Sequence, residues 1–230
     1  MLGHLNRSII MYHSIGDFPF SVRSETFVRQ LAVMRNRRFG FVSQATDGNM
    51  GVFLTFDDGY IDNYTVLYPI IRQLNIRVSI FVATNFIGKK YDFGRSQVCE
   101  VLTSTMIQEM SKSGLVEFGS HSHTHANLLR LSDREIEYEL GKSKDVLQSI
   151  TGQETQTFAF PFSIYNPVVP DILTKLRYRY GVTGRRGYVP RNPNLLCLPR
   201  WGVGVDTSYL SFRLKLLGVL RLPFPVGSHK

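Results

Sequence analysis

Short apolar runs that alternate with longer amphipathic stretches are the feature that most narrows the folds open to this 230-residue chain. Runs of about five residues indicate buried strands, and two extended segments follow toward the C-terminus. The expected strands and extended segments are Ser8–Tyr12, Gly51–Phe56, Val78–Ala83, Leu115–Gly119, Thr157–Phe160, Tyr180–Thr183 and Leu195–Leu198. This order predicts an α/β fold, a parallel sheet or barrel with helices outside it, in which functional groups gather at the carboxyl ends of the strands.

The helical stretches carry their own start signals. Ser132 and Glu135 form a capping box ahead of an apolar stripe that begins at Ile136. Pro69 is expected to kink the helix around it or to delay its start. No internal repeat, low-complexity tract or Pro/Ser-rich linker interrupts the chain, so we expect residues 1–230 to form a single domain.

The net charge of +9 is confined to the last quarter of the chain. Residues 1–170 carry 16 basic and 16 acidic side chains, whereas residues 171–230 carry 11 basic side chains against Asp171 and Asp206. This segment is either a solvated basic face or a surface that meets phosphate, anionic lipid or an acidic polymer. Nucleic acid is not the expected partner, because zinc-finger, RNA-recognition and basic leucine-zipper signatures are missing from the sequence.

Cysteine content and hydropathy indicate a cytoplasmic protein. Cys99 and Cys197 are too few for a disulfide framework and too far apart for a zinc knuckle, so we expect two buried free thiols. The sequence contains no run of eighteen apolar residues, and Met1–Ile15 lacks the pattern of a secretory signal.

Two adjacent carboxylates follow an apolar run directly in Thr55-Phe56-Asp57-Asp58-Gly59. Neighbouring acids at a strand end raise each other's pKa unless a cation or a shared proton offsets their repulsion. A metal ligand paired with a general base explains this arrangement. The alternative is an Asp-Gly turn in which one aspartate caps the next helix.

Three of the six histidines lie within residues 119–125, which read GSHSHTH and follow another expected strand. On a helical turn, His121 and His125 would share a face and could bind one ion, whereas His123 would point elsewhere. Two imidazoles and one carboxylate leave coordination positions open for water, as a hydrolytic metal requires. The alternative is a histidine-rich surface loop, but together with Asp57 and Asp58 the pattern favours a metal site.

With these motifs the chain resembles the NodB-homology polysaccharide deacetylases, carbohydrate esterases that use a metal to remove acetyl groups from N-acetylated glycans. Residues 55–59 match the first motif of that family, residues 119–125 resemble the second, and residues 158–162 (FAFPF) with Tyr165 and Asn166 resemble the third. The resemblance extends over about residues 8–220. It implies a distorted parallel (β/α) barrel, Asp57 as general base, a divalent ion, usually zinc, and Asp58, His121 and His125 as its ligands.

The sequence departs from the family pattern at two positions. The third motif usually carries an arginine that orients the base, but Ala159 stands there, as it does in the branch that resembles poly-N-acetylglucosamine deacetylases. We expect Arg200 to orient Asp57 instead. The late histidine motif that supplies the acid is also missing, so His13, in a Tyr-His pair typical of the same branch, is the expected general acid.

The resemblance predicts an enzyme that deacetylates an N-acetylhexosamine of a surface or exported glycan or of its lipid-linked precursor. Phe160, Phe162 and Trp201 are expected to wall the sugar pocket, and a backbone N–H near Phe162 to stabilise the oxyanion. Two other functions remain open. The chain could be a catalytically silent barrel that binds glycan or membrane, or a metal amidohydrolase that acts on a small cyclic amide.

The segment Ser208–Leu220 interleaves leucines with Arg213 and Lys215. It is predicted either to rest on anionic lipid at the inner face of the membrane or to pack on the barrel as an ordinary helix.

Overall fold

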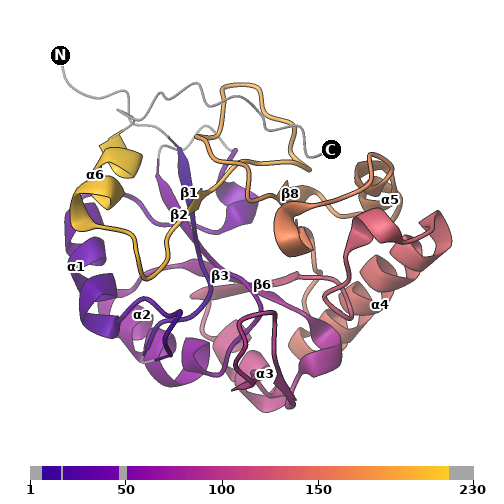
Figure 1. The fold of residues 1–230 in the computed structure, drawn as a ribbon, viewed down its shortest axis with the longest axis horizontal. Helices are drawn as coiled ribbons and strands as arrows, with labels where there is room; N and C mark the ends of the chain where they lie inside the picture. Colours follow the sequence, from indigo (N-terminus) through magenta and orange to yellow (C-terminus); the bar gives the residue numbers. More distant parts are fainter. Residues whose placement is uncertain (1–6, 17, 47–50, 218–230) are drawn as a thin grey trace.

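A seven-stranded sheet forms the centre of the structure, a computed structural model that describes residues 7–16, 18–46 and 51–217. Its strands follow the order β8-β7-β6-β3-β2-β1-β9, and all of their pairings are parallel. The strands are β1 (Ser8–Tyr12), β2 (Val52–Phe56), β3 (Val78–Val82), β6 (Val116–Ser120), β7 (Thr157–Ala159), β8 (Tyr180–Val182) and β9 (Trp201–Gly202). The sheet curls into a distorted half-barrel, which confirms the predicted α/β barrel (Figure 1).

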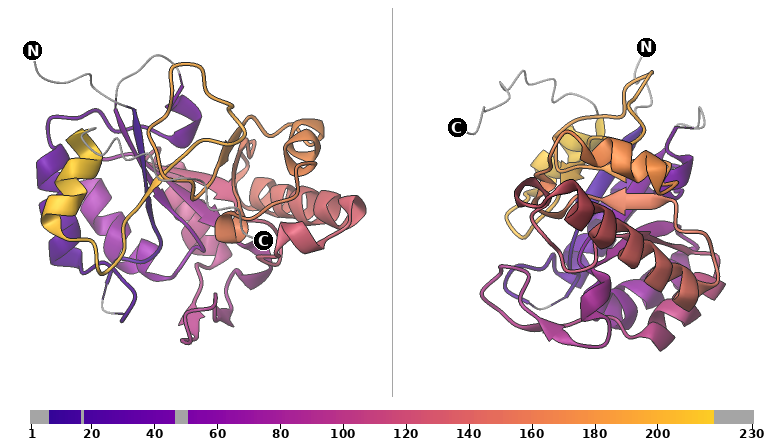
Figure 2. Two further views of the ribbon diagram at one scale, coloured as in Figure 1. Left: turned by 45° about the horizontal axis from the view of Figure 1, so that its top comes forward. Right: turned by 90° about the vertical axis from the view of Figure 1, so that its right-hand side faces the viewer.

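Helices pack around the outside of the curled sheet (Figures 1 and 2). They are α1 (Ser24–Met34), α2 (Tyr68–Leu74), α3 (Ser104–Lys112), α4 (Asp133–Thr151), α5 (Val169–Lys175) and α6 (Tyr209–Leu217). A small antiparallel pair, β4 (Lys90–Tyr91) and β5 (Cys99–Glu100), projects from the connection between β3 and α3. The predicted capping box is confirmed at the start of α4, because Ser132 and Glu135 each accept a hydrogen bond from the backbone N–H of the other.

Pro69 neither starts the helix around it nor ends it, but lies just after a change in its hydrogen bonding. Residues Asn63–Leu67 form one wide turn with π-helical hydrogen bonding, and α2 follows with Pro69 in its first turn. Proline is tolerated there because the first N–H groups of an α-helix have no carbonyl partner within the helix.

Alternate residues of each strand face two different cores. Phe53 of β2 and Phe81 of β3 pack inside the curl with Ile9 and Leu198. Leu54, the next residue of β2, faces the surrounding helices instead. This period of two is what a strand covered on both faces requires. Gly119 keeps space open inside the curl, because a Cβ atom there would lie 2.5 Å from the Phe81 ring.

The segment Leu195–Leu198, expected to be extended, is a turn followed by an isolated bridge. The Asn194 side chain accepts a hydrogen bond from the Leu196 N–H, and the Asn194 carbonyl accepts one from the Cys197 N–H, so a local turn replaces the extended ladder. Leu198 then pairs with Val182 of β8, and β9 pairs with β1. The chain between these pairings crosses from one edge of the sheet to the other, and it carries Arg200.

Helix α6 occupies most of the segment predicted from Ser208 to Leu220, and residues 218–220 lie outside the described residues. Phe212 and Leu216 are buried in the core beside α1, while Leu210 is exposed. Membrane contact and a cytoplasmic location stay predictions. Among the described residues, no helix has both the length and the apolar character needed to cross a membrane.

The two cysteines are free but differ in burial. Cys99 is buried, as expected. Cys197 is only half-buried, because the turn that contains it lies at the surface, and the expectation of a second buried thiol was wrong.

Candidate metal centre and active site

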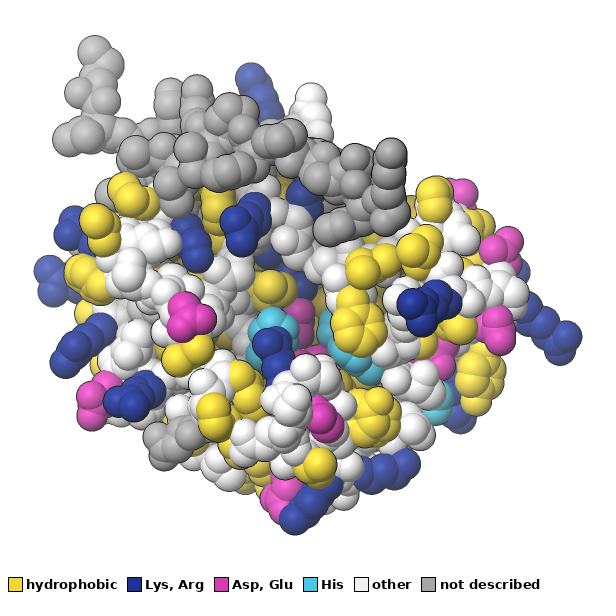
Figure 3. Space-filling model, viewed as in Figure 1, with side chains coloured by type: hydrophobic (Ala, Val, Ile, Leu, Met, Phe, Trp, Pro, Cys, Tyr) yellow, Lys and Arg dark blue, Asp and Glu magenta, His cyan; other side chains and the backbone are white. Residues whose placement is uncertain are grey.

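A cavity of about 350 Å³ lies at the carboxyl ends of the central strands. Figure 3 shows histidine and acidic side chains at the bottom of a hollow in this face of the molecule, with Lys and Arg side chains around it. The cavity is lined by Met11, His13, Asp57, Asp58, Phe93, Gly94, Arg95, His121, His125, Phe160, Phe162 and Ser163. Motifs that are far apart in the sequence therefore meet at this edge of the sheet, hereafter the reaction cavity.

Asp58, His121 and His125 converge on one point in the reaction cavity. The Nε2 atoms of His125 and His121 lie 3.3 Å and 3.5 Å from the same Oδ1 atom of Asp58, and the three ligand atoms lie within 4.8 Å of one another. All three side chains are nearly inaccessible to solvent. This is the donor set that the sequence predicted for a divalent ion.

The hydrogen bonding of His121 requires either a proton or a cation between its Nε2 atom and Asp58. Its Nδ1 lies 2.8 Å from the carbonyl oxygen of Ala159, and because a carbonyl can only accept, Nδ1 carries the proton. In the neutral ring the lone pair of Nε2 then faces the Asp58 carboxylate, and this contact is repulsive unless a proton or a cation lies between them. A proton or a divalent ion between the two atoms would remove this repulsion.

The two histidines converge through a loop, and the expectation that they share a helical face was wrong. Ser122 and His125 adopt left-handed backbone conformations, with φ of 61° and 56°. Glu139 on α4 fixes this loop, because its carboxylate accepts hydrogen bonds from the backbone N–H groups of His123 and Thr124 at 2.9 Å and 2.8 Å. These bonds compete with a helical ladder and aim both imidazoles inward.

His123 points away from the metal centre, as predicted. Its Nδ1 hydrogen-bonds with the Thr84 hydroxyl at 2.9 Å. Sequence reasoning missed Glu139, although a carboxylate three residues after Ile136, on the apolar stripe of α4, is a signal for a buried charge that needs partners.

Arg200 holds Asp57 through a bidentate ion pair. Its two terminal nitrogens donate to Oδ1 and Oδ2 of Asp57 at 2.8 Å and 2.7 Å, and both side chains are buried. The guanidinium is itself fixed, because Nε donates to the Thr183 carbonyl and Nη1 to the Thr55 hydroxyl, both at 3.0 Å. The structure thus places Arg200 against Asp57, the carboxylate that we expected it to orient. The contact has the planar, two-bond geometry that arginine favours with carboxylates.

The two aspartates remain charged for different reasons. Burial raises the pKa of Asp57, but the charge and hydrogen bonds of Arg200 outweigh it and lower the pKa below its usual value. Burial also raises the pKa of Asp58, and with no ion between them, hydrogen bonds from Nε2–H groups of His121 and His125 reverse this and hold the pKa well below the usual range.

His13 lies at the end of β1 and lines the reaction cavity beside both aspartates. Burial lowers its pKa, and the negative charges of Asp58 and Asp57 partly offset that effect. The Asn63 amide donates to the His13 carbonyl at 3.2 Å and to Asp62 at 2.9 Å, and the Ser14 hydroxyl donates to Asp62. Asp62 and Asn63, which sequence reasoning missed, therefore fix the loop that presents His13.

Backbone strain is concentrated around the reaction cavity. Of the non-glycine residues with positive φ in the described part of the chain, five belong to this region. They are Asp58, Ser122, His125, Phe162 and Ser163, with φ between 55° and 74°. Such conformations cost about 1–3 kcal/mol each and cluster where a fold must present side chains for function.

The three aromatic residues predicted to wall a sugar pocket lie in different places. Phe160 is buried against Tyr165 and Phe158, so only its edge lines the reaction cavity. Phe162 is 53% exposed, and its ring lies 4.6 Å from that of His125. Trp201 lines a neighbouring groove together with Tyr188, whose ring lies 5.3 Å away.

The sequence of this chain is similar to those of known polysaccharide deacetylases. Residues 44–181 match the polysaccharide deacetylase family. The chain is 29% identical to YxkH of Bacillus subtilis over 161 residues, which cover 70% of this chain and 54% of YxkH. It is 26% identical over 157 residues to a poly-β-1,6-N-acetyl-D-glucosamine N-deacetylase of Staphylococcus aureus, covering 65% of this chain and 53% of that protein. The chain thus spans about half the length of the curated relatives it matches.

Solved structures share the fold over almost the whole chain. The Streptococcus pyogenes deacetylase PplD in complex with acetate superposes with a TM-score of 0.78 at 28% identity, covering 91% of this chain and 97% of PplD. IcaB from Ammonifex degensii superposes with a TM-score of 0.79 at 22% identity, covering 91% and 94% of the two chains, and supports the fold alone.

Proposed function

Because this chain belongs to the polysaccharide deacetylase family, we propose that it is a metal-dependent N-deacetylase that acts on an N-acetylhexosamine of a surface or exported glycan or of its lipid-linked precursor. The observation that carries the proposal is the convergence of Asp58, His121 and His125 beside Asp57. The named activity of the Staphylococcus aureus relative supports N-acetylglucosamine as the sugar.

The donor set fits a divalent ion, and we propose zinc. Two imidazole nitrogens and one carboxylate oxygen form a three-ligand set typical of catalytic zinc sites, and the hydrogen bond from His121 to Ala159 supplies the outer support that such ligands need. When bound, the ion supplies Lewis acidity toward water and toward the acetamide carbonyl.

Asp57 is proposed to accept the proton of the attacking water. Its lowered pKa keeps it ionised, and each of its oxygens has a second lone pair that the bond from Arg200 leaves free. Arg200 is a positioning residue, because the bidentate contact fixes the orientation of the carboxylate toward the cavity.

His13 is proposed to protonate the departing amine. Water adds to the acetamide carbon, the C–N bond breaks, and the amine nitrogen takes a proton from the imidazole, so that acetate and a free amine are released. The position of His13 in the reaction cavity beside both aspartates supports this role. A backbone N–H beside Phe162 is proposed to donate to the oxyanion.

Acetate release from N-acetylglucosamine oligomers tests the proposal. We expect release with added zinc or cobalt and loss of release after chelation. Protein that purifies without metal and is unaffected by divalent ions would instead be a silent binding barrel. Ring opening of a small cyclic amide without acetate release would identify an amidohydrolase of another class.

A further inference from the structure

A second and larger hollow adjoins the reaction cavity. It has a volume of about 1120 Å³ and shares Met11, His13 and Arg95 with the reaction cavity. Its other walls come from the loop after β8, from β9 and the residues that follow it, and from α6. We call this hollow the basic groove. The residues that complete it are Ser14, Phe20, Val22, Gly184, Arg185, Arg186, Gly187, Tyr188, Trp201, Gly202, Val203, Gly204, Asp206, Thr207, Ser211 and Lys215.

The charges in the basic groove are strongly unbalanced. Of the described lining residues, Arg95, Arg185, Arg186 and Lys215 are cationic and Asp206 alone is acidic. The three arginines are exposed, and none of them forms an ion pair with an acidic side chain in the described part of the chain. Three of the basic side chains of residues 171–230, namely Arg185, Arg186 and Lys215, therefore line one concave surface.

Two of these cations, Lys215 and Arg186, lie close enough to repel one another. Burial lowers the pKa of Lys215, and the charge of Arg186 lowers it further. Lys215 also donates to the Gly202 carbonyl at 2.8 Å, so the ammonium is held in place. A solvated basic face would spread such charges apart, whereas a cleft lined by one sign of charge concentrates the field that attracts a counter-ion.

The basic groove is directly connected to the reaction cavity. Arg95 lines both hollows, and its charge acts on His13, whose pKa it lowers. An anion bound near Arg95 would thus lie next to the group that we propose as the general acid.

On the basis of the proposed deacetylase function, we propose that the basic groove binds a phosphate or diphosphate ester carried by the saccharide substrate, next to the sugar whose acetyl group enters the reaction cavity. A guanidinium matches the oxygens of a phosphate with two parallel hydrogen bonds, and Arg185 and Arg186 offer two such groups on one loop. An excess of three positive charges is suited to an anion with more than one negative charge.

Binding is tested through the single tryptophan of the chain, Trp201, which lines the basic groove. Its fluorescence is expected to change in a saturable way with N-acetylglucosamine 1-phosphate, at concentrations about tenfold below those needed for N-acetylglucosamine. The response should weaken in high salt. The double variant R185A/R186A should lose it, while R134A/K142A, which removes two exposed cations from α4, should keep it.

The double variant also separates the groove from the metal centre, because it keeps Asp58, His121 and His125. Phosphate binding that persists unchanged in R185A/R186A would show that Arg185 and Arg186 do not hold the anion and would overturn the inference. Equal responses to the phosphorylated and the neutral sugar would do the same.

Kinetics separate this inference from the proposed function. We expect a phosphate ester on an N-acetylglucosamine oligomer to lower KM, and R185A/R186A to raise that KM about tenfold while kcat and the KM for the neutral oligomer stay unchanged. Hydrolysis of both oligomers with equal KM would refute the groove but not the deacetylase. If neither oligomer releases acetate, the proposed function fails, and the fluorescence titration still decides the groove.

Two further substrates identify the source of the anion. A lower KM for a polyprenyl-diphosphate saccharide than for the water-soluble phosphate would support the groove and assign the lipid-linked precursor, whereas equal values would support it and assign a phosphate within the glycan. Equal preference for a glucuronate-containing oligomer would overturn the choice of phosphate.

Discussion

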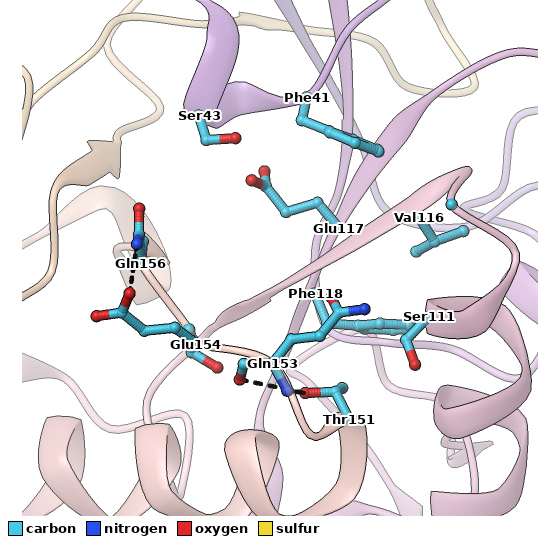
Figure 4. A pocket seen from close by; sticks show the side chains of 12 residues that line it. Phe41, Ser43, Ser111, Val116, Glu117, Phe118, Thr151, Gln153, Glu154 and Gln156 are labelled. Carbon is cyan, nitrogen blue, oxygen red and sulfur yellow. Dashed lines mark hydrogen bonds between the residues drawn. The ribbon is translucent and has the colours of Figure 1, made fainter.

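Each end of the curled sheet contains a cavity lined by a carboxyl group, half-buried at the amino end and buried at the carboxyl end, and the partners of these groups differ. At the amino ends of the strands, a cavity of about 280 Å³ receives the side chain of Glu117 from β6, whose carboxyl group extends toward Ser43 (Figure 4). The Ser79 hydroxyl donates to Glu117 at 2.7 Å. At the carboxyl ends, Asp57 faces a guanidinium and Asp58 faces two imidazoles.

The pKa directions follow from these partners. Burial raises the pKa of Glu117, and hydroxyl and backbone donors only partly oppose it, so this carboxyl group takes up a proton more readily than an ordinary glutamate. The pKa values of Asp57 and Asp58 are lowered. Four of the described residues that line the reaction cavity have a strained positive φ, and none of the described non-glycine residues around Glu117 does. The comparison teaches that the carboxyl end combines carboxyl groups of lowered pKa with backbone strain, as a catalytic site requires, whereas the amino end has neither.

The largest expected effect is on catalysis at the carboxyl end. Asp57→Asn keeps the shape of the side chain but removes the proposed base, so kcat for acetate release should fall by about 10²-fold or more. Glu117→Gln is the matched control at the other end and should leave kcat unchanged. Equal loss in the two variants, or full activity of Asp57→Asn, would remove the distinction between the ends.

The next effect concerns the ion pair that fixes the base. Arg200→Met leaves Asp57 buried without its partner, which should cost about 3–5 kcal/mol of unfolding free energy, measured by urea denaturation. Arg200→Lys keeps the charge but loses the planar fork, so kcat should fall and the acidic limb of the pH–rate profile should move to higher pH as the pKa of Asp57 rises. An unshifted pH profile in Arg200→Lys would contradict the positioning role.

Asp62 tests whether the partners of a carboxyl group, and not its place in the fold, set the direction of its pKa shift. It lies at the carboxyl end, like Asp57 and Asp58, but its partners are a hydroxyl and an amide. Burial raises its pKa to about 6, above the usual 3.8, so the folded protein binds this proton more tightly than the unfolded chain. Stability contributed by protonated Asp62 is complete below pH 4 and is lost as pH rises through 6, by roughly 3 kcal/mol. Asp62→Asn should remove this component, as urea unfolding at pH 4 and pH 7 can measure. An unchanged pH dependence in the variant would contradict the raised pKa.

The smallest expected effect is at the amino end. Because the pKa of Glu117 is raised above that of an unfolded chain, its contribution to stability is present at acidic pH and declines as pH rises through the folded value. Glu117→Gln should flatten that decline in urea unfolding. A steeper dependence in the variant would mean that Glu117 is charged and paired in the folded protein.

Much of this architecture could be predicted from the sequence. The strands β1, β2, β3 and β6 begin and end within a residue of their apolar runs, and Asp57, Asp58 and His121 follow strand ends directly, so their convergence at one edge follows from parallel pairing. The loop that carries the histidines could not be predicted, because its left-handed Ser122 depends on hydrogen bonds to Glu139, a residue of a distant helix. The basic groove could not be predicted from the sequence either. Arg95 and Arg186 are far apart in the chain, and only the fold brings them to the lining of one hollow.

The central claim is that Asp58, His121 and His125 together hold one divalent cation. Elemental analysis after incubation with zinc and dialysis tests it most directly. The wild type and Glu117→Gln should each retain one zinc ion per chain, whereas Asp58→Ala and His121→Ala should retain little or none. Equal zinc content in all four proteins, or none in the wild type, would contradict the account.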